Sequence, residues 1–267
     1  MTWHMGLVFG IGLIVGSFVN VMIHRLPRMI TAEAISHTST ERFDLYWPAS
    51  HCPHCQTPIK PWHNIPVLSY VWLKGRCMDC QHPIRASYPI VELATGLIWL
   101  ACTWRWGLDS QSLCWAVFAT LLLTLSIIDW QTTLLPDDLT QTLVWTGLMA
   151  SAAGWLSLEL HQAVWGVVAG YGSLWAIATT FEAITGKQGM GAGDFKLLAG
   201  LGAWVGPLAL IPLVMLASLS GACVGLYLKF TGRLRPDGYV PFGPFLALAG
   251  WLVAVVGLNP ILAWMGW

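Results

Sequence analysis

The sequence predicts an all-α polytopic membrane protein with about eight transmembrane helices, and three features carry that prediction. Of the 267 residues, 56% are hydrophobic and only 10% are charged, whereas roughly a quarter of the residues in a soluble protein are charged. Several apolar runs approach the roughly 20 residues that cross a bilayer as a helix. The basic residues gather in alternate connecting segments. Lipid is therefore the expected surrounding of most of the chain, and a formal net charge of zero gives no reason to expect a nucleic-acid partner.

The first transmembrane span is expected over Trp3–Ile23. Arg25 and Arg28 follow this apolar run, and no Lys or Arg precedes it. A cleaved secretory signal shows the reverse order and ends at a small-residue cleavage site. We therefore expect an uncleaved helix with its N-terminus outside.

Three domains are expected along the chain: a first transmembrane helix (1–23), a polar segment (24–87) and a membrane domain (88–267). The polar segment holds seven of the thirteen Lys and Arg residues and four of the seven cysteines. Beyond it the chain is apolar with short interruptions, and the tightest of these is the join at Gly206–Pro207. The further spans are expected at 89–105, 110–129, 138–157, 162–184, 193–206, 207–229 and 241–265.

The distribution of basic residues indicates which side of the membrane each loop occupies. Eight spans with the N-terminus outside place segments 24–87, 130–137, 185–192 and 230–240 on one side. These segments and their edges hold eleven Lys and Arg residues, and the opposite side holds only Arg105. By the positive-inside rule, the side rich in basic residues is cytoplasmic.

Four cysteines in the polar segment have the spacing of a metal site. They form two Cys-x-x-Cys pairs, Cys52 with Cys55 and Cys77 with Cys80. Four thiolates complete a tetrahedral Zn²⁺ site, and a cytoplasmic location argues against structural disulfides. We therefore expect one structural Zn²⁺ in a small cytoplasmic zinc-binding domain between the first and second helices. Redox-active dithiols without a metal are the alternative.

Two aspartates lie at the edges of apolar runs. Asp129 ends the third span, in "SIIDWQTTLLPDDLTQTL", and Asp194 begins the sixth, in "GMGAGDFKLLAG". The third span runs inward and the sixth outward, so both carboxylates are expected at the same depth on the cytoplasmic side. Two carboxylates in one poorly solvated site do not both ionise readily, and one therefore keeps a proton. An acid beside an ionised base is suited to activating water against a peptide carbonyl.

The residues around these aspartates have distinct expected roles. Gly191 and Gly193 would let a substrate backbone approach closely and would permit unusual backbone angles. Asp137 and Asp138 follow a proline and suit the first turn of a helix. Lys196 either extends to the membrane interface or acts on the aspartates, and the sequence leaves this open.

These motifs together resemble the type IV prepilin peptidase family, the bifunctional leader peptidase/N-methyltransferases. The resemblance runs over nearly the whole chain, and its Gly-x-Gly-Asp signature stands here at residues 191–194. The segments that carry it are the two Cys-x-x-Cys pairs, "GSFVNVMIHRLP" (16–27), "RASYPIVELATG" (85–96), "IDWQTTLLPDDLT" (128–140), "GMGAGDFKLLA" (189–199) and "PFGPFLALAG" (241–250).

The resemblance implies an aspartic endopeptidase of the bacterial inner membrane, with Asp129 and Asp194 as the catalytic residues. Such an enzyme cleaves the basic leader of type IV prepilins or type II secretion pseudopilins after a glycine, on the cytoplasmic side. It then N-methylates the new N-terminal residue with S-adenosylmethionine. Candidates for methyl transfer or for binding this cofactor are Asn20, Arg25 and Glu92. Each also has a structural interpretation, as a hydrogen-bond partner between helices (Asn20, Glu92) or as a topology anchor (Arg25).

Two other classes of protein compete with this interpretation. Intramembrane acids beside a lysine are usual in ion- or proton-coupled transporters, but a transporter would favour carboxylates at mid-membrane and an inverted repeat. The acids here lie at one edge, and no internal repeat is evident. A non-enzymatic subunit of a secretion machine would explain a zinc domain for docking, but it would leave the aspartate pair without a role.

Overall fold

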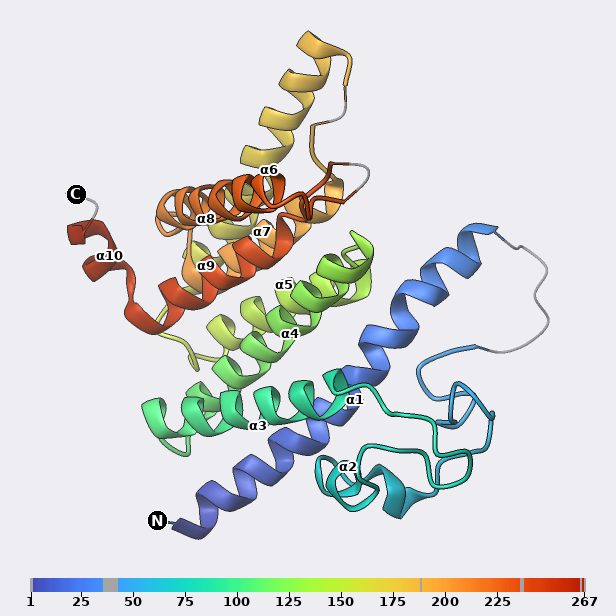
Figure 1. Cartoon of the computed structure of the whole chain (residues 1–267). Coiled ribbons are helices and arrows are strands. Elements are labelled where there is room, and N and C mark those ends of the chain that lie inside the picture. Colours follow the sequence, from blue (N-terminus) through green and yellow to red (C-terminus); the bar gives the residue numbers. More distant parts are fainter. Residues whose placement is uncertain (1, 36–42, 188, 236–237, 265, 267) are drawn as a thin grey trace. The chain divides into compact units, whose positions relative to one another are not determined.

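The computed structural model describes residues 2–35, 43–187, 189–235, 238–264 and 266, and most of these residues are helical (Figure 1). The described residues contain no named β-strand and only two isolated bridges, which pair His51 with Pro58 and Arg76 with Pro83. The all-helical class expected from the sequence is thus confirmed. The chain divides into two compact units, Met1–Ala116 and Val117–Trp267, and the boundary falls within a helix.

The first unit is built on two helices, α1 (Thr2–Ile35) and α3 (Ser87–Trp106), which pack against each other. Small residues allow this approach: a Cβ added at Gly12 would lie 2.8 Å from the Cα of Gly96, and one at Gly16 would lie 2.7 Å from the Cα of Glu92. Helices in membranes commonly associate through small residues at this four-residue spacing. Between the two helices the chain forms η1 (Pro61–Asn64), α2 (Leu68–Trp72) and the cysteine turns.

Helix α1 is longer than the expected first span. It continues past Ile23 to Ile35 and contains Pro27. A proline removes one helical hydrogen bond and introduces a local clash, but here it does not end the helix. The change to polar residues after Ile23 therefore marks a change of surroundings and not the end of the helix.

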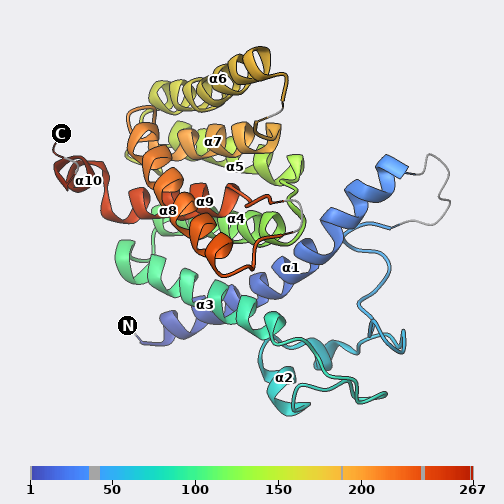
Figure 2. The same ribbon diagram turned by 45° about the horizontal axis from the view of Figure 1, so that its top comes forward.

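The second unit is organised around α7, of whose fourteen residues ten are buried. Helices α5, α6 and α9 pack on it, and Figure 2 shows α7 lying between α5 and α6. Phe118 of α4 stacks near Trp204 of α7, with ring centroids 4.8 Å apart. The helices are α4 (Ser110–Thr132), α5 (Asp137–Ala152), α6 (Leu160–Thr185), α7 (Ala192–Val205), α8 (Leu210–Phe230), α9 (Gly243–Val256) and α10 (Leu258–Trp264).

The backbones of α6 and α7 touch directly. A Cβ at Gly166 would lie 2.0 Å from the carbonyl oxygen of Gly202, and a Cβ at Gly202 would lie 2.1 Å from that of Gly166. One turn further along α6, a Cβ at Gly170 would lie 2.6 Å from the carbonyl oxygen of Leu198. Only glycine fits at Gly166 and Gly202, because any side chain there would enter the backbone of the other helix.

Each expected span overlaps a helix, but three bounds need correction. The expected span 138–157 extends five residues beyond the end of α5 at Ala152, and the expected span 207–229 begins three residues before α8. The expected last span, 241–265, is broken at Gly257 into α9 and α10, and its final residue lies outside the described part of the chain. Gly257 has a φ of 87° and a ψ of 159°, an extended conformation with positive φ that is open almost only to glycine. Helix α7 ends in the same way at Gly206, where the sequence shows a tight join between two apolar runs.

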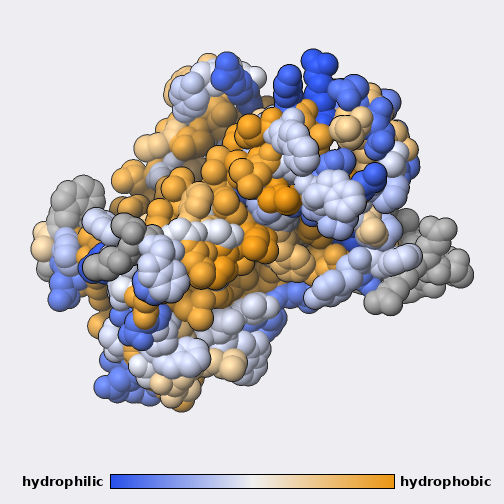
Figure 3. Space-filling model, turned by 90° about the horizontal axis from the view of Figure 1, so that it is seen from below, coloured by the Kyte–Doolittle hydropathy of each residue, from blue (hydrophilic) through white to orange (hydrophobic). Residues whose placement is uncertain are grey.

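Four of the described helices are long and apolar enough to cross a membrane, by length and composition: Trp3–Ala32 within α1, and α4, α6 and α8. Large apolar side chains are exposed on α6, among them Trp165, Val168 and Ile177. Figure 3 shows broad apolar areas on the surface. Lipid contact explains such a surface, since a water-soluble monomer rarely exposes large apolar areas. The number of eight spans stays a prediction.

Candidate active site and metal centre

Two buried aspartates lie near each other in the second unit. Asp129, in the last turn of α4, is 3% exposed, and Asp194, in the first turn of α7, is 4% exposed. They are close enough for the charge of Asp129 to act on Asp194. The main-chain N–H of Gly243, at the start of α9, donates a hydrogen bond of 3.0 Å to Oδ2 of Asp129. The ends of three helices therefore meet at this pair.

Leu135, in the α4–α5 connection, explains how these helix ends are held together. A Cβ at Gly193 would lie 2.8 Å from the Cβ of Leu135, and one at Gly243 would lie 3.4 Å from its Cδ2. The connection from α4 to α5 thus runs against the first turns of both α7 and α9. Glycine at these two positions lets the helix starts approach the connection that follows Asp129.

The segment that precedes α9 lies beside the aspartates. The guanidinium of Arg235 donates a hydrogen bond to the carbonyl oxygen of Trp130. Partial burial, together with the negative charges of Asp194 and Asp129, raises the pKa of Tyr239. A cavity of about 200 Å³ opens here. It is lined by Trp130, Leu228, Arg233, Leu234, Arg235, Tyr239, Val240 and Pro241.

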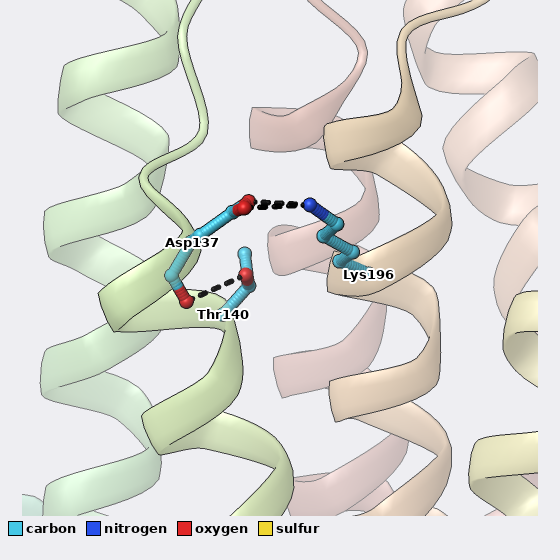
Figure 4. A network of polar contacts seen from close by, with 3 residues as sticks. All are labelled: Asp137, Thr140 and Lys196. Atoms are coloured by element: carbon cyan, nitrogen blue, oxygen red, sulfur yellow. Dashed lines mark hydrogen bonds and ion pairs between the residues drawn. The ribbon is translucent and has the colours of Figure 1, made fainter. Parts of the chain in front are cut away.

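Lys196 pairs with Asp137 (Figure 4). Its Nζ donates to both carboxylate oxygens of Asp137, over 2.6 and 2.7 Å. Thr140 in turn donates to the main-chain oxygen of Asp137 over 3.1 Å. Asp137 also lies in the first turn of α5, as its position after a proline suggested. The role that the sequence left open for Lys196 is therefore answered: it links the start of α7 to the start of α5.

The two glycines of the signature have different surroundings. A Cβ at Gly191 would meet nothing within 4 Å, so the space before α7 is open there, whereas Gly193 packs on Leu135. Gly191 has a φ of −78°, and neither glycine has a positive φ. The unusual backbone angles expected for them are therefore absent. Instead, Gly191 adjoins open space, and Gly193 allows close packing on Leu135.

In the first unit, the four expected cysteines form one cluster. The Sγ atoms of Cys52, Cys55, Cys77 and Cys80 all lie within 4.8 Å of one another. Those of Cys52 and Cys80 are 3.8 Å apart, which is the edge of a tetrahedron with metal–sulfur bonds of about 2.3 Å. Four thiols in this arrangement fit a closed tetrahedral metal site.

The two cysteine turns have the same structure, which the sequence reading missed. In each, the N–H of a glutamine donates to the carbonyl oxygen of the first cysteine, from Gln56 over 2.9 Å and from Gln81 over 3.1 Å. Both glutamines have a positive φ, of 59° and 58°. The signal is in the sequence, since Cys-x-x-Cys-Gln-x-Pro-Ile occurs at 52–59 and again at 77–84. This short internal repeat builds two matching halves of one site.

The three residues considered for methyl transfer bond to main-chain groups of the first unit. Asn20 donates to the carbonyl oxygen of Tyr88 over 3.0 Å, which joins α1 to α3. Arg25 donates to the carbonyl oxygens of Asp44 and Pro48, over 2.8 and 2.6 Å.

Glu92 accepts a bond of 2.8 Å from the N–H of Val67, a valine with a φ of 61°. Val67 immediately precedes α2, so a buried carboxylate of α3 holds the start of that helix. These four bonds link α1, α3 and the segment between them, and they do not gather the three side chains around one described cavity.

Gly243 was not assigned a role from the sequence. It lies in "PFGPFLALAG", one of the segments that carry the resemblance. The available signal was a Gly-Pro pair at the start of the expected last span, on the side of the membrane that the sequence predicts for both aspartates. A side-chain search could not find it, because its contribution to the site is a main-chain N–H.

Comparison with known proteins divides the chain in a similar way. Residues 11–106 match the bacterial peptidase A24 N-terminal domain, and residues 116–226 match the type IV leader peptidase family. A prepilin leader peptidase/N-methyltransferase of Pseudomonas putida is 43% identical over 259 residues, which cover 92% of this chain and 88% of that protein. The protein of the same name from Aeromonas hydrophila is 43% identical over 277 residues, covering 98% and 93%.

A third relative of that name, from Pseudomonas aeruginosa, is 42% identical over 257 residues, covering 92% and 88%. No solved structure matches the chain. With such identity over most of both chains, and with both halves matched, this protein belongs to the type IV leader peptidase family.

Proposed function

We propose that this protein is a membrane aspartic endopeptidase that removes the basic leader of type IV prepilins or type II secretion pseudopilins and then N-methylates the new N-terminal residue. The observation that carries the proposal is the buried pair of Asp129 and Asp194 where α4, α7 and α9 meet. The relatives named prepilin leader peptidase/N-methyltransferase support the substrate class and both activities.

The pair supplies what hydrolysis of a peptide bond requires. One carboxylate takes a proton from water while the oxygen of that water bonds to the scissile carbonyl carbon, and the other gives its proton to the carbonyl oxygen. When the tetrahedral intermediate collapses, the C–N bond breaks and the leaving amine takes the proton first removed from water. At the same time one hydroxyl group of the intermediate returns its proton to the second carboxylate as the C=O bond forms again. Burial of both aspartates keeps one of them protonated at neutral pH.

The surroundings of the pair leave room for a polypeptide. The cavity beside Trp130 and Tyr239 adjoins the aspartates, and the open space at Gly191 lies at the start of the helix that carries Asp194. A transporter fits less well, because Asp129 and Asp194 lie at the ends of helices. The proposed topology places these ends at one membrane face, whereas transporters bind their substrates near the midplane.

The proposed function is tested by incubating the purified protein with a prepilin in detergent and sequencing the N-terminus of the product. We expect cleavage after the glycine that ends the leader. With S-adenosylmethionine present, mass spectrometry should show one added methyl group on the new N-terminal residue. An intact prepilin after incubation with folded, metal-replete protein would contradict the proposal.

We also propose that S-adenosylmethionine supplies the methyl group and that Asn20, Arg25 and Glu92 contribute to this activity. All three lie within residues 11–106, which match the bacterial peptidase A24 N-terminal domain, and the relatives' name supports the methyl transfer. Their described hydrogen bonds go to main-chain groups and, for Glu92, also to the side chain of Ser17, and we derive no step through the cofactor. Their role here is to fix α1, α3 and the intervening segment relative to one another.

The polar segment 24–87 is proposed to be a zinc-binding domain held by one structural Zn²⁺. The cluster of four cysteines supports it, since four thiolates close a tetrahedron and leave no position for a metal-bound water. Where the structure describes this segment, it has only two short helices besides the end of α1, and the metal should supply much of its folding free energy.

Replacing Cys52 and Cys55 with serine should therefore remove the metal and make segment 24–87 sensitive to protease, while the membrane helices stay assembled. Elemental analysis of the wild type should give one zinc per chain. Cys102→Ser is the matched control, because this buried cysteine of α3 lies outside the cluster. Wild type without zinc, prepared without chelators and with all four thiols free, would contradict the assignment.

The chain is proposed to cross the bacterial inner membrane eight times with the aspartate pair facing the cytoplasm. Gln131 is exposed and lies two residues beyond Asp129, and it offers a position for testing this topology. A cysteine that replaces Gln131, in a background without other reactive thiols, should be labelled from the cytoplasmic side only. Labelling from the outside would contradict the proposed topology.

A further inference from the structure

We propose that Gly243 is a positioning residue that holds Asp129 as the ionised base, so that Asp194 is the aspartate that carries the proton. This inference rests on the proposed peptidase activity and assigns the two carboxylates their separate roles. It follows from the contacts at the start of α9, from the space around Gly243 and from the surroundings of Asp194.

The first turn of α9 directs its available N–H at Asp129. Gly243 donates to Oδ2 of Asp129 over 3.0 Å, at a buried position. The next residue, Pro244, has no N–H, and the N–H groups of Phe245 and Leu246 bond back to the carbonyl oxygen of Phe242, over 3.1 and 3.2 Å. A helix N-terminus carries partial positive charge, and this bond brings that charge onto one carboxylate oxygen. Both effects favour the ionised form of Asp129.

Asp194 lacks such a donor. Among the described residues no group donates a hydrogen bond to its side chain, although it is 4% exposed. It lies in the first turn of α7, whose dipole also favours a carboxylate. A direct hydrogen bond to a charged oxygen outweighs the more diffuse field of a helix end, and the negative charge of Asp129 opposes a second charge at Asp194. The proton therefore resides on Asp194.

The space at Gly243 shows why the residue is glycine. A Cβ there would lie 2.6 Å from Oδ2 and 3.2 Å from Cγ of Asp129, and both distances are too short for carbon. The atom struck first is the end of a side chain, which moves more easily than backbone. In a Gly243→Ala protein the carboxylate would thus rotate away from the N–H while α9 keeps its place.

Among the described residues of the second unit, three other titratable or charged groups face Asp129. They are Asp194 on α7, and Arg235 and Tyr239 on the segment before α9. Arg235 is already engaged with the carbonyl oxygen of Trp130. None of these groups changes in the Gly243→Ala protein, so a change in pH dependence would report the lost contact itself.

The first experiment compares Gly243→Ala with Gly250→Ala on purified, folded protein. Gly243→Ala should lower kcat for prepilin cleavage on the order of a hundredfold, the scale expected when a reacting group is displaced by about 1 Å, with KM nearly unchanged. The acid limb of its pH profile should move to higher pH, because a carboxylate without its donor binds a proton more tightly. Gly250→Ala is a matched control on the same helix, since its Cβ would lie 2.5 Å from Cδ2 of Leu201 and away from Asp129. It should keep the wild-type pH profile.

The second experiment measures the contact in the wild type and needs no folded Gly243 variant. The chain has two Phe–Gly pairs, Phe9–Gly10 and Phe242–Gly243. Labelling with ¹³C-carbonyl phenylalanine and ¹⁵N-glycine therefore selects the amides of Gly10 and Gly243 in NMR spectra. The Gly243 signal should move with pH in the wild type and stop moving in Asp129→Asn. Gly10, which has open space around it, should stay constant.

The two experiments distinguish a failure of the proposed function from a failure of the positioning role of Gly243. If the wild type does not cleave prepilin, the proposed function fails, and the NMR titration still decides whether Gly243 holds Asp129. If the wild type cleaves but Gly243→Ala cleaves as fast with the same pH profile, the positioning role is wrong. It is also wrong if the Gly243 signal ignores pH, or if it moves equally in Asp129→Asn.

Discussion

Asp129→Asn and Asp194→Asn should each abolish leader cleavage in a protein that stays folded. Asparagine keeps the size of the side chain but neither takes up nor releases a proton as a carboxyl group does. An enzyme that relies on one acid and one base then loses a general-acid or general-base contribution on the order of 10²- to 10⁴-fold. The rate of product formation from a prepilin, with thermal unfolding as the check on folding, is the measurement.

Asp137→Asn is the matched control for these two substitutions. Asp137 also lies near the start of α7, but its side chain is 66% exposed and its partner is Lys196. An exposed ion pair contributes about 1 kcal/mol or less to stability, so cleavage should stay near the wild-type rate. Wild-type-like cleavage by Asp129→Asn or Asp194→Asn would contradict the proposed catalytic role of the two aspartates.

Methylation of pre-cleaved pilin should survive the Asp194→Asn substitution. If a folded Asp194→Asn protein lost both cleavage and methylation, the two reactions would share a site.

Gly202→Ala should cause a large loss of stability together with loss of cleavage. Its new Cβ would lie 2.1 Å from the carbonyl oxygen of Gly166, and backbone cannot rotate away as a side-chain end can. The two helices must separate, which should cost about 3 kcal/mol, at the upper end of the usual cost of overpacking. Because α7 carries Asp194, the aspartate pair should lose its geometry as the helices part. Thermal unfolding in detergent, recorded beside the cleavage rate, checks both effects.

Gly172→Ala is the control for this prediction. It lies on α6 as well, and a Cβ there would meet nothing within 4 Å. Its melting temperature should equal that of the wild type or rise slightly, since alanine suits a helix better than glycine. If Gly202→Ala melted with the wild type, the direct backbone contact between α6 and α7 would be wrong.

The sequence predicted the helices well because their apolar runs are long and their ends are marked by glycine and proline. It also predicted which side chains cluster at each site, since aspartates at membrane edges and paired Cys-x-x-Cys motifs are side-chain signals. It placed the end of the first helix too early, because polar composition follows the environment and not the hydrogen bonding of the backbone. It missed the break at Gly257, where the apolar character continues on both sides of the break.

The contacts made by main-chain atoms could not be predicted in this way. Nothing in the letters of "PFGPFLALAG" states that the N–H of Gly243 points at Asp129. The ion pair of Lys196 with Asp137 joins residues 59 positions apart, and only packing of α5 on α7 brings them together. Both features depend on how helices are placed beside each other, which periodicity does not determine.

The short length of α7 has a consequence for the lipid around the protein. Its 14 residues rise about 21 Å at the usual 1.5 Å per residue, whereas the hydrocarbon core of a bilayer is about 30 Å thick. Its neighbour α6, with 26 residues, rises about 39 Å. In the proposed topology, helix α7 by itself therefore falls short of the full thickness of the hydrocarbon core, and a local thinning of the bilayer or a recess among the longer helices must make up the difference at one of its ends. Because Asp194 lies at one end of this short helix, the acyl-chain length of the host lipid becomes a variable that should change the cleavage rate.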